Sequence, residues 1–160
     1  LKSAAALIKA DVGVEVIEVD RTGWDTHSEQ GTLSGRMEVL LTDLATGVAA
    51  LYKDMLPTRI NTLTMILHSE FGRRVEENGS EGSDHGHGNC MFFVGGGIKG
   101  KQVLSKWPGL ALTKRYKGLD LEVTIDYRDL FAEIVEKRLG NANTKLVFPN
   151  HTYTPQGITA

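Results

Sequence analysis

The amino-acid sequence predicts an α/β fold of three layers, in which a mostly parallel sheet carries helices on both faces and includes one β-hairpin. Short β-branched runs at residues 14–19 and 62–67 are typical of buried strands, and the apolar spacing of residues 33–55 is typical of a helix. A strand, a helix and a second strand in this order favour parallel pairing, because the helix carries the chain back across one face of the sheet.

Three helices are predicted from apolar residues that recur at helical spacing. The first covers residues 1–10, and the second covers residues 33–55 with a long apolar stripe that faces a core. The third begins after Asp126, whose side chain can cap the first turn, and it ends before Gly140, a residue type that commonly terminates helices.

Two further strands are predicted at residues 91–94 and 98–104, joined into a hairpin by the three glycines at 95–97. The polar stretch at residues 69–89 is predicted to be a loop, and a loop of this length in a small domain is usually functional or disordered. The elements predict one domain over residues 1–149, followed by a tail at residues 150–160.

The composition limits the class of protein. The net charge is −2 and no basic stripe is present, so nucleic acid is not an expected partner. No apolar run approaches the roughly 20 residues that span a membrane. Cys90 is the single cysteine, so cysteine usage does not identify the compartment. The sequence opens at Leu1 inside a predicted helix, and we therefore expect it to be part of a longer polypeptide.

Polar side chains follow the two predicted strands, where ligand sites lie in open parallel sheets. Asp25 and His27 follow the first strand, and Glu70, His85 and His87 follow the second. A carboxylate and imidazoles are the ligands of a divalent metal such as zinc or manganese. The alternative for Asp25 and His27 is an aspartate that closes a turn beside a surface histidine.

The segment at residues 69–74 combines a carboxylate with two guanidinium groups. Glu70 is a candidate metal ligand or general base, and Arg73 or Arg74 is a candidate contact for an anionic substrate. The alternative is a solvated charge cluster in which the arginines pair with Glu76 and Glu77.

The segment Asp84-His85-Gly86-His87-Gly88 is the most distinctive in the sequence. In an extended chain both histidines point to the same side and can reach one ion, while Asp84 serves as the acceptor that fixes a histidine tautomer. The alternative is a flexible glycine-rich loop with surface histidines.

Six ordered motifs resemble a known family of bacterial proteins. They are Gly-Trp-Asp-Thr-His at 23–27, Ser-Glu-Phe-Gly-Arg at 69–73, Asp-His-Gly at 84–86, the glycines at 95–97, Trp-Pro-Gly-Leu at 107–110 and Asp-Tyr-Arg-Asp at 126–129. The sequence is similar from about residue 1 to residue 149 to the domain-of-unknown-function family 1501, and it looks like the C-terminal portion of such a protein.

This family is similar in fold to the alkaline phosphatase and sulfatase superfamily, so the resemblance implies a partial alkaline-phosphatase-like fold. It also implies a divalent metal (zinc, manganese or calcium) held by Asp25, His27 and His85, with His87 as a less direct substitute. Ser69-Glu70 stands where the superfamily has an Asp-His pair, and the segment for its nucleophile has no counterpart among these residues.

The function implied by the resemblance is metal-dependent hydrolysis of a small phosphate or sulfate ester. The alternative is a non-catalytic binding or assembly module that keeps the fold. A homo-oligomer or an additional N-terminal segment is expected to complete the site. Nothing in the sequence itself identifies the compartment, although members of the family are commonly exported or periplasmic.

Overall fold

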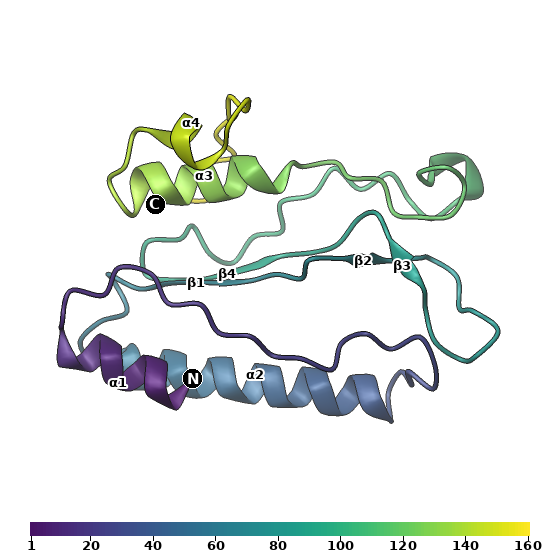
Figure 1. Cartoon of the computed structure of the whole chain (residues 1–160), viewed down its shortest axis with the longest axis horizontal. Coiled ribbons are helices and arrows are strands. Elements are labelled where there is room, and N and C mark those ends of the chain that lie inside the picture. The colour runs from purple at the N-terminus through teal and green to yellow at the C-terminus, as the bar shows by residue number, and fades with distance from the viewer.

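The computed structural model describes residues 1–160, and its short strands run between two groups of helices (Figure 1). Helices α1 (Lys2–Ala10) and α2 (Arg36–Met55) lie on one side of the strands, and α3 (Tyr127–Lys137) and α4 (Thr144–Val147) lie on the other. The strands are β1 (Thr64–Leu67), β2 (Gly72–Arg73), β3 (His85–Gly86) and β4 (Phe92–Gly95), and a short 3-10 helix, η1, covers Leu112–Lys114.

The strands form two antiparallel pairs. Strand β1 pairs with β4, with Thr64 opposite Gly95 and Leu67 opposite Phe92, and β2 pairs with β3, with Arg73 opposite His85. The predicted mostly parallel, three-layer sheet is therefore wrong. The connection between β1 and β4 folds back on itself as the β2–β3 pair, so it forms a local hairpin in place of the crossover that parallel pairing requires.

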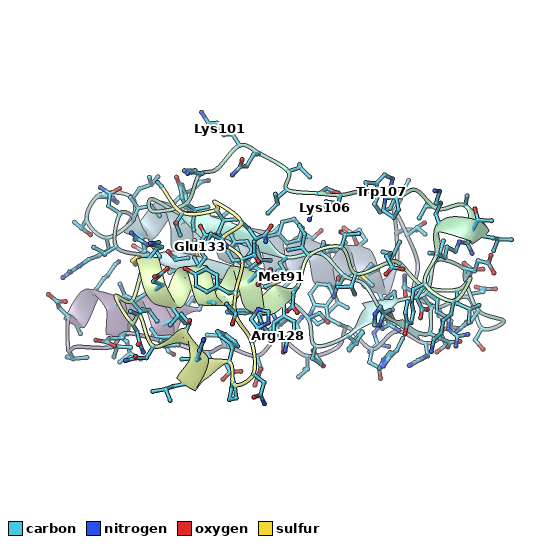
Figure 2. All side chains as sticks on the ribbon, turned by 90° about the horizontal axis from the view of Figure 1, so that it is seen from above. Met91, Lys101, Lys106, Trp107, Arg128 and Glu133 are labelled. Atoms are coloured by element: carbon cyan, nitrogen blue, oxygen red, sulfur yellow. The ribbon has the colours of Figure 1, made fainter.

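The predicted hairpin between residues 91–94 and 98–104 is also wrong. Strand β4 pairs with β1 alone, and residues 99–107 form no regular element. Ile98 instead makes an isolated bridge to Thr159 near the C-terminus. Figure 2 shows the result from the α3 side, where Lys101 projects from the rim of the molecule.

The predicted strand at residues 14–19 has no partner. Residues 14–20 make no backbone–backbone hydrogen bond, and in Figure 1 this stretch passes between the strands and helix α2. Its β-branched composition favours an extended conformation, but a strand needs a neighbour to satisfy its N–H and C=O groups.

The three predicted long helices are confirmed, with ends that differ by a few residues. A buried apolar cluster lies between α3 and the β1–β4 pair. Leu130 and Ile134 of α3 are buried there with Ile158, and Ile66 and Phe93 pack against them. None of the helices is both long enough and apolar enough to cross a membrane.

Residues 150–160, predicted to be a tail, pack along one face of α3. Asp129, Glu133 and Glu136 follow one another at i, i+4 and i+7 and accept hydrogen bonds from this segment. Glu133 is only 2% exposed, and its carboxylate accepts from the backbone N–H groups of Gln156, Gly157 and Thr159 and from the Thr159 hydroxyl. Figure 2 shows Glu133 beside the yellow-green ribbon of α3.

Helix α3 begins as predicted, with Asp126 as its N-cap. The Asp126 carboxylate accepts a hydrogen bond from the Arg128 backbone N–H at 2.9 Å and also pairs with the Arg128 guanidinium. Replacing Asp126 with alanine is expected to lower the free energy of unfolding by about 1 kcal/mol, because it leaves a first-turn donor without a partner. Urea unfolding measures the change. The exposed Glu122→Ala is the matched control, and an equal loss in both variants would contradict a capping role.

Candidate metal centre

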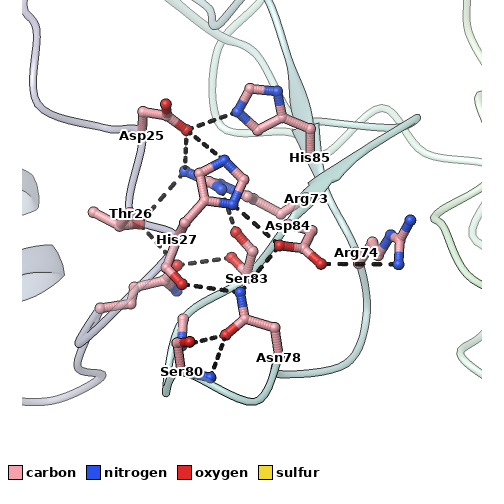
Figure 3. A network of polar contacts seen from close by, with 12 residues as sticks. Asp25, Thr26, His27, Arg73, Arg74, Asn78, Ser80, Ser83, Asp84 and His85 are labelled. Atoms are coloured by element: carbon pink, nitrogen blue, oxygen red, sulfur yellow. Dashed lines mark hydrogen bonds and ion pairs between the residues drawn. The ribbon is translucent and has the colours of Figure 1, made fainter.

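Two loops and the β2–β3 pair meet at one end of the molecule and form a continuous polar network (Figure 3). The loop at residues 26–30 is joined to residues 80–83 by backbone hydrogen bonds, from Glu29 to Ser80 at 3.0 Å and from Gln30 to Glu81 at 2.9 Å. These bonds fix the loop that follows the unpaired 14–20 stretch against the turn that connects β2 to β3.

Buried polar side chains hold the base of this network. Thr26 is fully buried, and its hydroxyl donates to the side-chain oxygen of Gln30 at 2.8 Å. The same oxygen accepts from the Ser83 hydroxyl at 2.7 Å. Arg73, on β2, donates to the carbonyl oxygens of Trp24 and Ser83, so its guanidinium links the two loops. Each buried polar group therefore has a partner, as a rigid site requires.

Asp25, His27 and His85 lie together above this base. The Asp25 Oδ1 atom lies 2.7 Å from His85 Nε2 and 3.0 Å from His27 Nε2, and one ligand atom from each residue lies within 4.8 Å of the others. Ligands of a tetrahedral zinc ion are about 3.4 Å apart, because each lies about 2.1 Å from the metal. The separations of 2.7 and 3.0 Å are those of hydrogen bonds, so the ligand atoms would have to move apart by about 0.4–0.7 Å to hold an ion. One carboxylate and two imidazoles are a ligand set for a divalent transition metal, and all three side chains are exposed to solvent.

Asp84 orients His27 through the ring nitrogen that faces away from Asp25. Its Oδ1 atom lies 3.1 Å from Nδ1 of His27, the ring nitrogen opposite to the one that faces Asp25. Asn78 holds Asp84 in turn, because its side-chain N–H group donates to Asp84 at 3.0 Å and to the backbone carbonyl of His27 at 2.9 Å. A carboxylate on the far nitrogen of a histidine sets the tautomer that presents the near nitrogen to a metal.

The rings at the site are stacked. Phe71 lies against His85 with ring centroids 4.1 Å apart and planes inclined by 6°, and the His85 ring stacks on His27 at 4.9 Å. The Arg73 guanidinium also lies over the Phe71 ring, 4.7 Å from its centroid. This stack limits the rotation of both imidazoles and keeps their nitrogens directed toward Asp25.

The surroundings favour the charged form of both carboxylates. The hydrogen bond with His85 has the largest effect and lowers the pKa of Asp25, desolvation opposes it, and the charges of His27, His85 and Arg73 lower the pKa further. Hydrogen bonds from Asn78 and then His27 lower the pKa of Asp84. Ionised carboxylates are the form that ligates or orients a metal site.

Two glycines permit the close approach that builds the site. A Cβ atom on Gly82 would lie 2.3 Å from the backbone carbonyl carbon of His27, and one on Gly86 would lie 2.3 Å from that of Arg73. Any larger residue at these positions would push the loop and the β2–β3 pair apart. The glycines around His85 therefore serve backbone packing.

The structure brings three of the predicted site residues together and leaves others outside the cluster. Glu70 is exposed and does not belong to it. His87 stacks on the Tyr116 ring at 4.0 Å and is not among the three clustered residues. Arg73 reaches within 3.6 Å of Asp25 but is bound to backbone carbonyls, whereas Arg74 is half exposed and lies 3.8 Å from Asp84.

Sequence reasoning missed four members of the network: Thr26, Gln30, Phe71 and Asn78. One signal was available for the last of these. The dipeptide Asn78-Gly79 is a strong hairpin indicator, and it lies between the two short strands that present Arg73 and His85.

Comparison with known proteins places the chain in a family. No curated protein and no solved structure matches the sequence. A family model described as a protein of unknown function, DUF1501, matches residues 3–159, which include every residue of the polar network. The chain therefore belongs to the DUF1501 family of proteins of unknown function.

Proposed function

We propose that this protein binds a divalent metal ion, zinc or manganese, through Asp25, His27 and His85, and that it hydrolyses a phosphate or sulfate ester there. The convergence of the three ligand atoms within 4.8 Å is the observation that carries the proposal. A metal bound at this site would polarise an ester oxygen and offset its developing negative charge. The resemblance to the alkaline phosphatase and sulfatase superfamily suggests the reaction class, and the architecture of paired short strands adds no support to it.

The surrounding side chains divide into positioning and substrate-binding roles. Asp84 orients His27, and Arg73 holds the two loops together through backbone carbonyls. Arg74 is the cation available to an anionic ester, because its guanidinium is half exposed and its contact with Asp84 is long, at 3.8 Å.

Metal titration of the purified chain, followed by an ester-hydrolysis assay, tests the proposal. We expect zinc or manganese to bind at one equivalent and to activate the release of nitrophenol from nitrophenyl phosphate or nitrophenyl sulfate. Absence of metal binding would overturn the whole proposal. Metal binding without hydrolysis of either ester would overturn the catalytic part and favour a non-catalytic binding or assembly module.

Replacing Asp84 with asparagine is expected to weaken metal binding by about 10- to 100-fold, the usual effect of removing a carboxylate behind a ligating histidine. Asparagine has nearly the same shape as aspartate and keeps one side-chain oxygen that can accept from Asn78, so the fold should persist. Asp54→Asn is the matched control, because Asp54 pairs with Lys9 on the helices α2 and α1, away from the cluster. Isothermal titration calorimetry measures both, and equal affinity in the two variants would argue against an orienting role for Asp84.

A further inference from the structure

The turn that connects β2 to β3 contains the one asparagine of the chain that precedes a glycine, Asn78-Gly79. Each of the other five asparagines is followed by a residue with a side chain. Glycine has no Cβ atom to shield its backbone nitrogen from the side chain before it. Gly79 is exposed, and its N–H group donates to no protein acceptor. The Gly79 nitrogen is therefore free to approach the Asn78 amide.

The Asn78 side chain is held in an arrangement that favours attack at its amide carbon. Its Oδ1 atom accepts hydrogen bonds from the backbone N–H groups of Ser80 at 2.9 Å and Gly82 at 3.1 Å (Figure 3). The ring that the bond from Ser80 closes contains both Cγ of Asn78 and the nitrogen of Gly79, so one tight turn keeps these two atoms together. Two fixed N–H donors on one oxygen also stabilise the negative charge that develops there when the amide carbon is attacked.

We propose that Asn78 is a self-modification site, at which the Gly79 backbone nitrogen displaces the side-chain amide in the folded chain. The new bond joins the Gly79 nitrogen to Cγ of Asn78 and closes a succinimide ring. The Cγ–Nδ2 bond breaks, and the amide nitrogen leaves as ammonia with the proton that Gly79 releases. Water then opens the ring at either carbonyl and yields aspartate or isoaspartate at position 78. The reaction requires no reagent other than water.

The product of this reaction acts on the candidate metal centre, and this consequence rests on the proposed function. The Asn78 Nδ2 group donates to Asp84 at 3.0 Å and to the backbone carbonyl of His27 at 2.9 Å, and conversion removes both bonds. Conversion to aspartate also sets a second carboxylate beside Asp84, and like charges this close repel each other. Because Asp84 orients His27, the modified chain should bind zinc about 10- to 100-fold more weakly. Asn78 thus limits how long the centre stays intact.

Ageing of the full metal-free chain at mildly alkaline pH, followed by peptide mass mapping, tests the modification. We expect Asn78 to gain the mass of an amide-to-acid conversion at least about tenfold faster than the other five asparagines, because fixed donors to a developing oxyanion contribute more than this in enzymes. Gly79→Ala should slow the conversion by about tenfold or more, because its Cβ atom shields the nitrogen. Equal rates at all asparagines, or an unchanged rate in Gly79→Ala, would overturn the proposal.

The Gly79→Ala variant should keep the native fold, because a Cβ atom at this position meets nothing within 4 Å. Gly100→Ala is the matched control. It adds a Cβ atom at a second exposed glycine that is equally open, and Asn78 should convert in this variant as it does in the unmodified chain.

Zinc titration of fresh and aged samples tests the consequence for the metal centre. The aged unmodified chain should bind zinc about 10- to 100-fold more weakly than the fresh chain, whereas aged Gly79→Ala should keep its fresh affinity. Asn78→Asp reproduces one product and should show the same loss without ageing. Full conversion with an unchanged affinity would overturn this consequence. If the fresh chain binds no zinc, the proposed metal site fails on its own, and mass mapping still decides whether Asn78 is modified.

Discussion

Replacing Asp25 with alanine is expected to weaken zinc binding by more than about 100-fold, and replacing His85 with alanine should have a similar effect. The loss of a group behind a ligand already costs about 10- to 100-fold in affinity, so the loss of the ligand itself should cost more. Asp25 is the more informative position because its Oδ1 atom faces both imidazoles, at 2.7 and 3.0 Å. Competition with a chromophoric chelator measures affinities across this range.

His87→Ala provides the matched control for these variants. His87 lies two residues from His85 in the sequence and is also exposed, but its ring stacks on Tyr116. The His87→Ala variant should bind zinc with the affinity of the unmodified chain. Far-ultraviolet circular dichroism checks that each variant keeps its helices. Wild-type affinity in both Asp25→Ala and His85→Ala would rule out the proposed ligands, whereas a loss in His87→Ala alone would move the site to the other histidine.

Replacing Glu133 with glutamine is expected to destabilise the protein by about 2–4 kcal/mol. Hydrogen bonds to a charged group contribute about 1.5–3 kcal/mol each, and a buried donor that loses its acceptor adds a desolvation cost. The Glu133 carboxylate accepts four hydrogen bonds from Gln156, Gly157 and Thr159. The amide of glutamine presents N–H groups to some of these donors. Urea unfolding measures the loss, and Glu136→Gln, which disturbs mainly the contact with Tyr153, should cost less.

The same residue makes stability depend on pH in a defined direction. Burial alone would raise the pKa of Glu133, but hydrogen bonds from Thr159, Gln156 and Gly157 outweigh it and hold the pKa below its ordinary value of 4.5. A carboxyl with a lowered pKa in the folded state stabilises the fold fully above pH 4.5, and this contribution is lost as the pH falls through the lower folded-state pKa. The unmodified chain should therefore lose more stability than Glu133→Gln between pH 5 and pH 3. Parallel losses in the two proteins would contradict this assignment.

The helices could be predicted because their signals are local. Asp126 caps α3 as its residue type and position indicated, and the apolar stripe of residues 33–55 forms α2. The pairing of strands could not be predicted in the same way, because residues 14–19 and 62–67 have similar β-branched compositions and only the second finds a partner. The composition of a segment indicates that it can adopt the extended conformation. Whether it pairs depends on which other segment the fold places beside it.

The candidate site was predictable in part for a related reason. Asp25, His27 and His85 were recognised from their chemistry, and the structure brings them together. His87 was grouped with His85 on the expectation of an extended chain, but strand β3 ends at Gly86 and the next side chain is directed to Tyr116. Gln30 gives no sequence signal because a single amide does not reveal the partners it bridges, and the dipeptide Asn78-Gly79 marks the turn between the two short strands without revealing that Asn78 holds Asp84.

The stacked rings make the site observable without any label. Aromatic rings shift the magnetic resonances of protons held above their faces, and the His85 ring lies between Phe71 at 4.1 Å and His27 at 4.9 Å. Its carbon-bound ring protons should resonate upfield of those of an unstacked histidine and should move as metal is added. A spectrum of five histidines is simple enough to follow this signal in the intact chain, so occupancy of the site can be read directly during a search for its substrate.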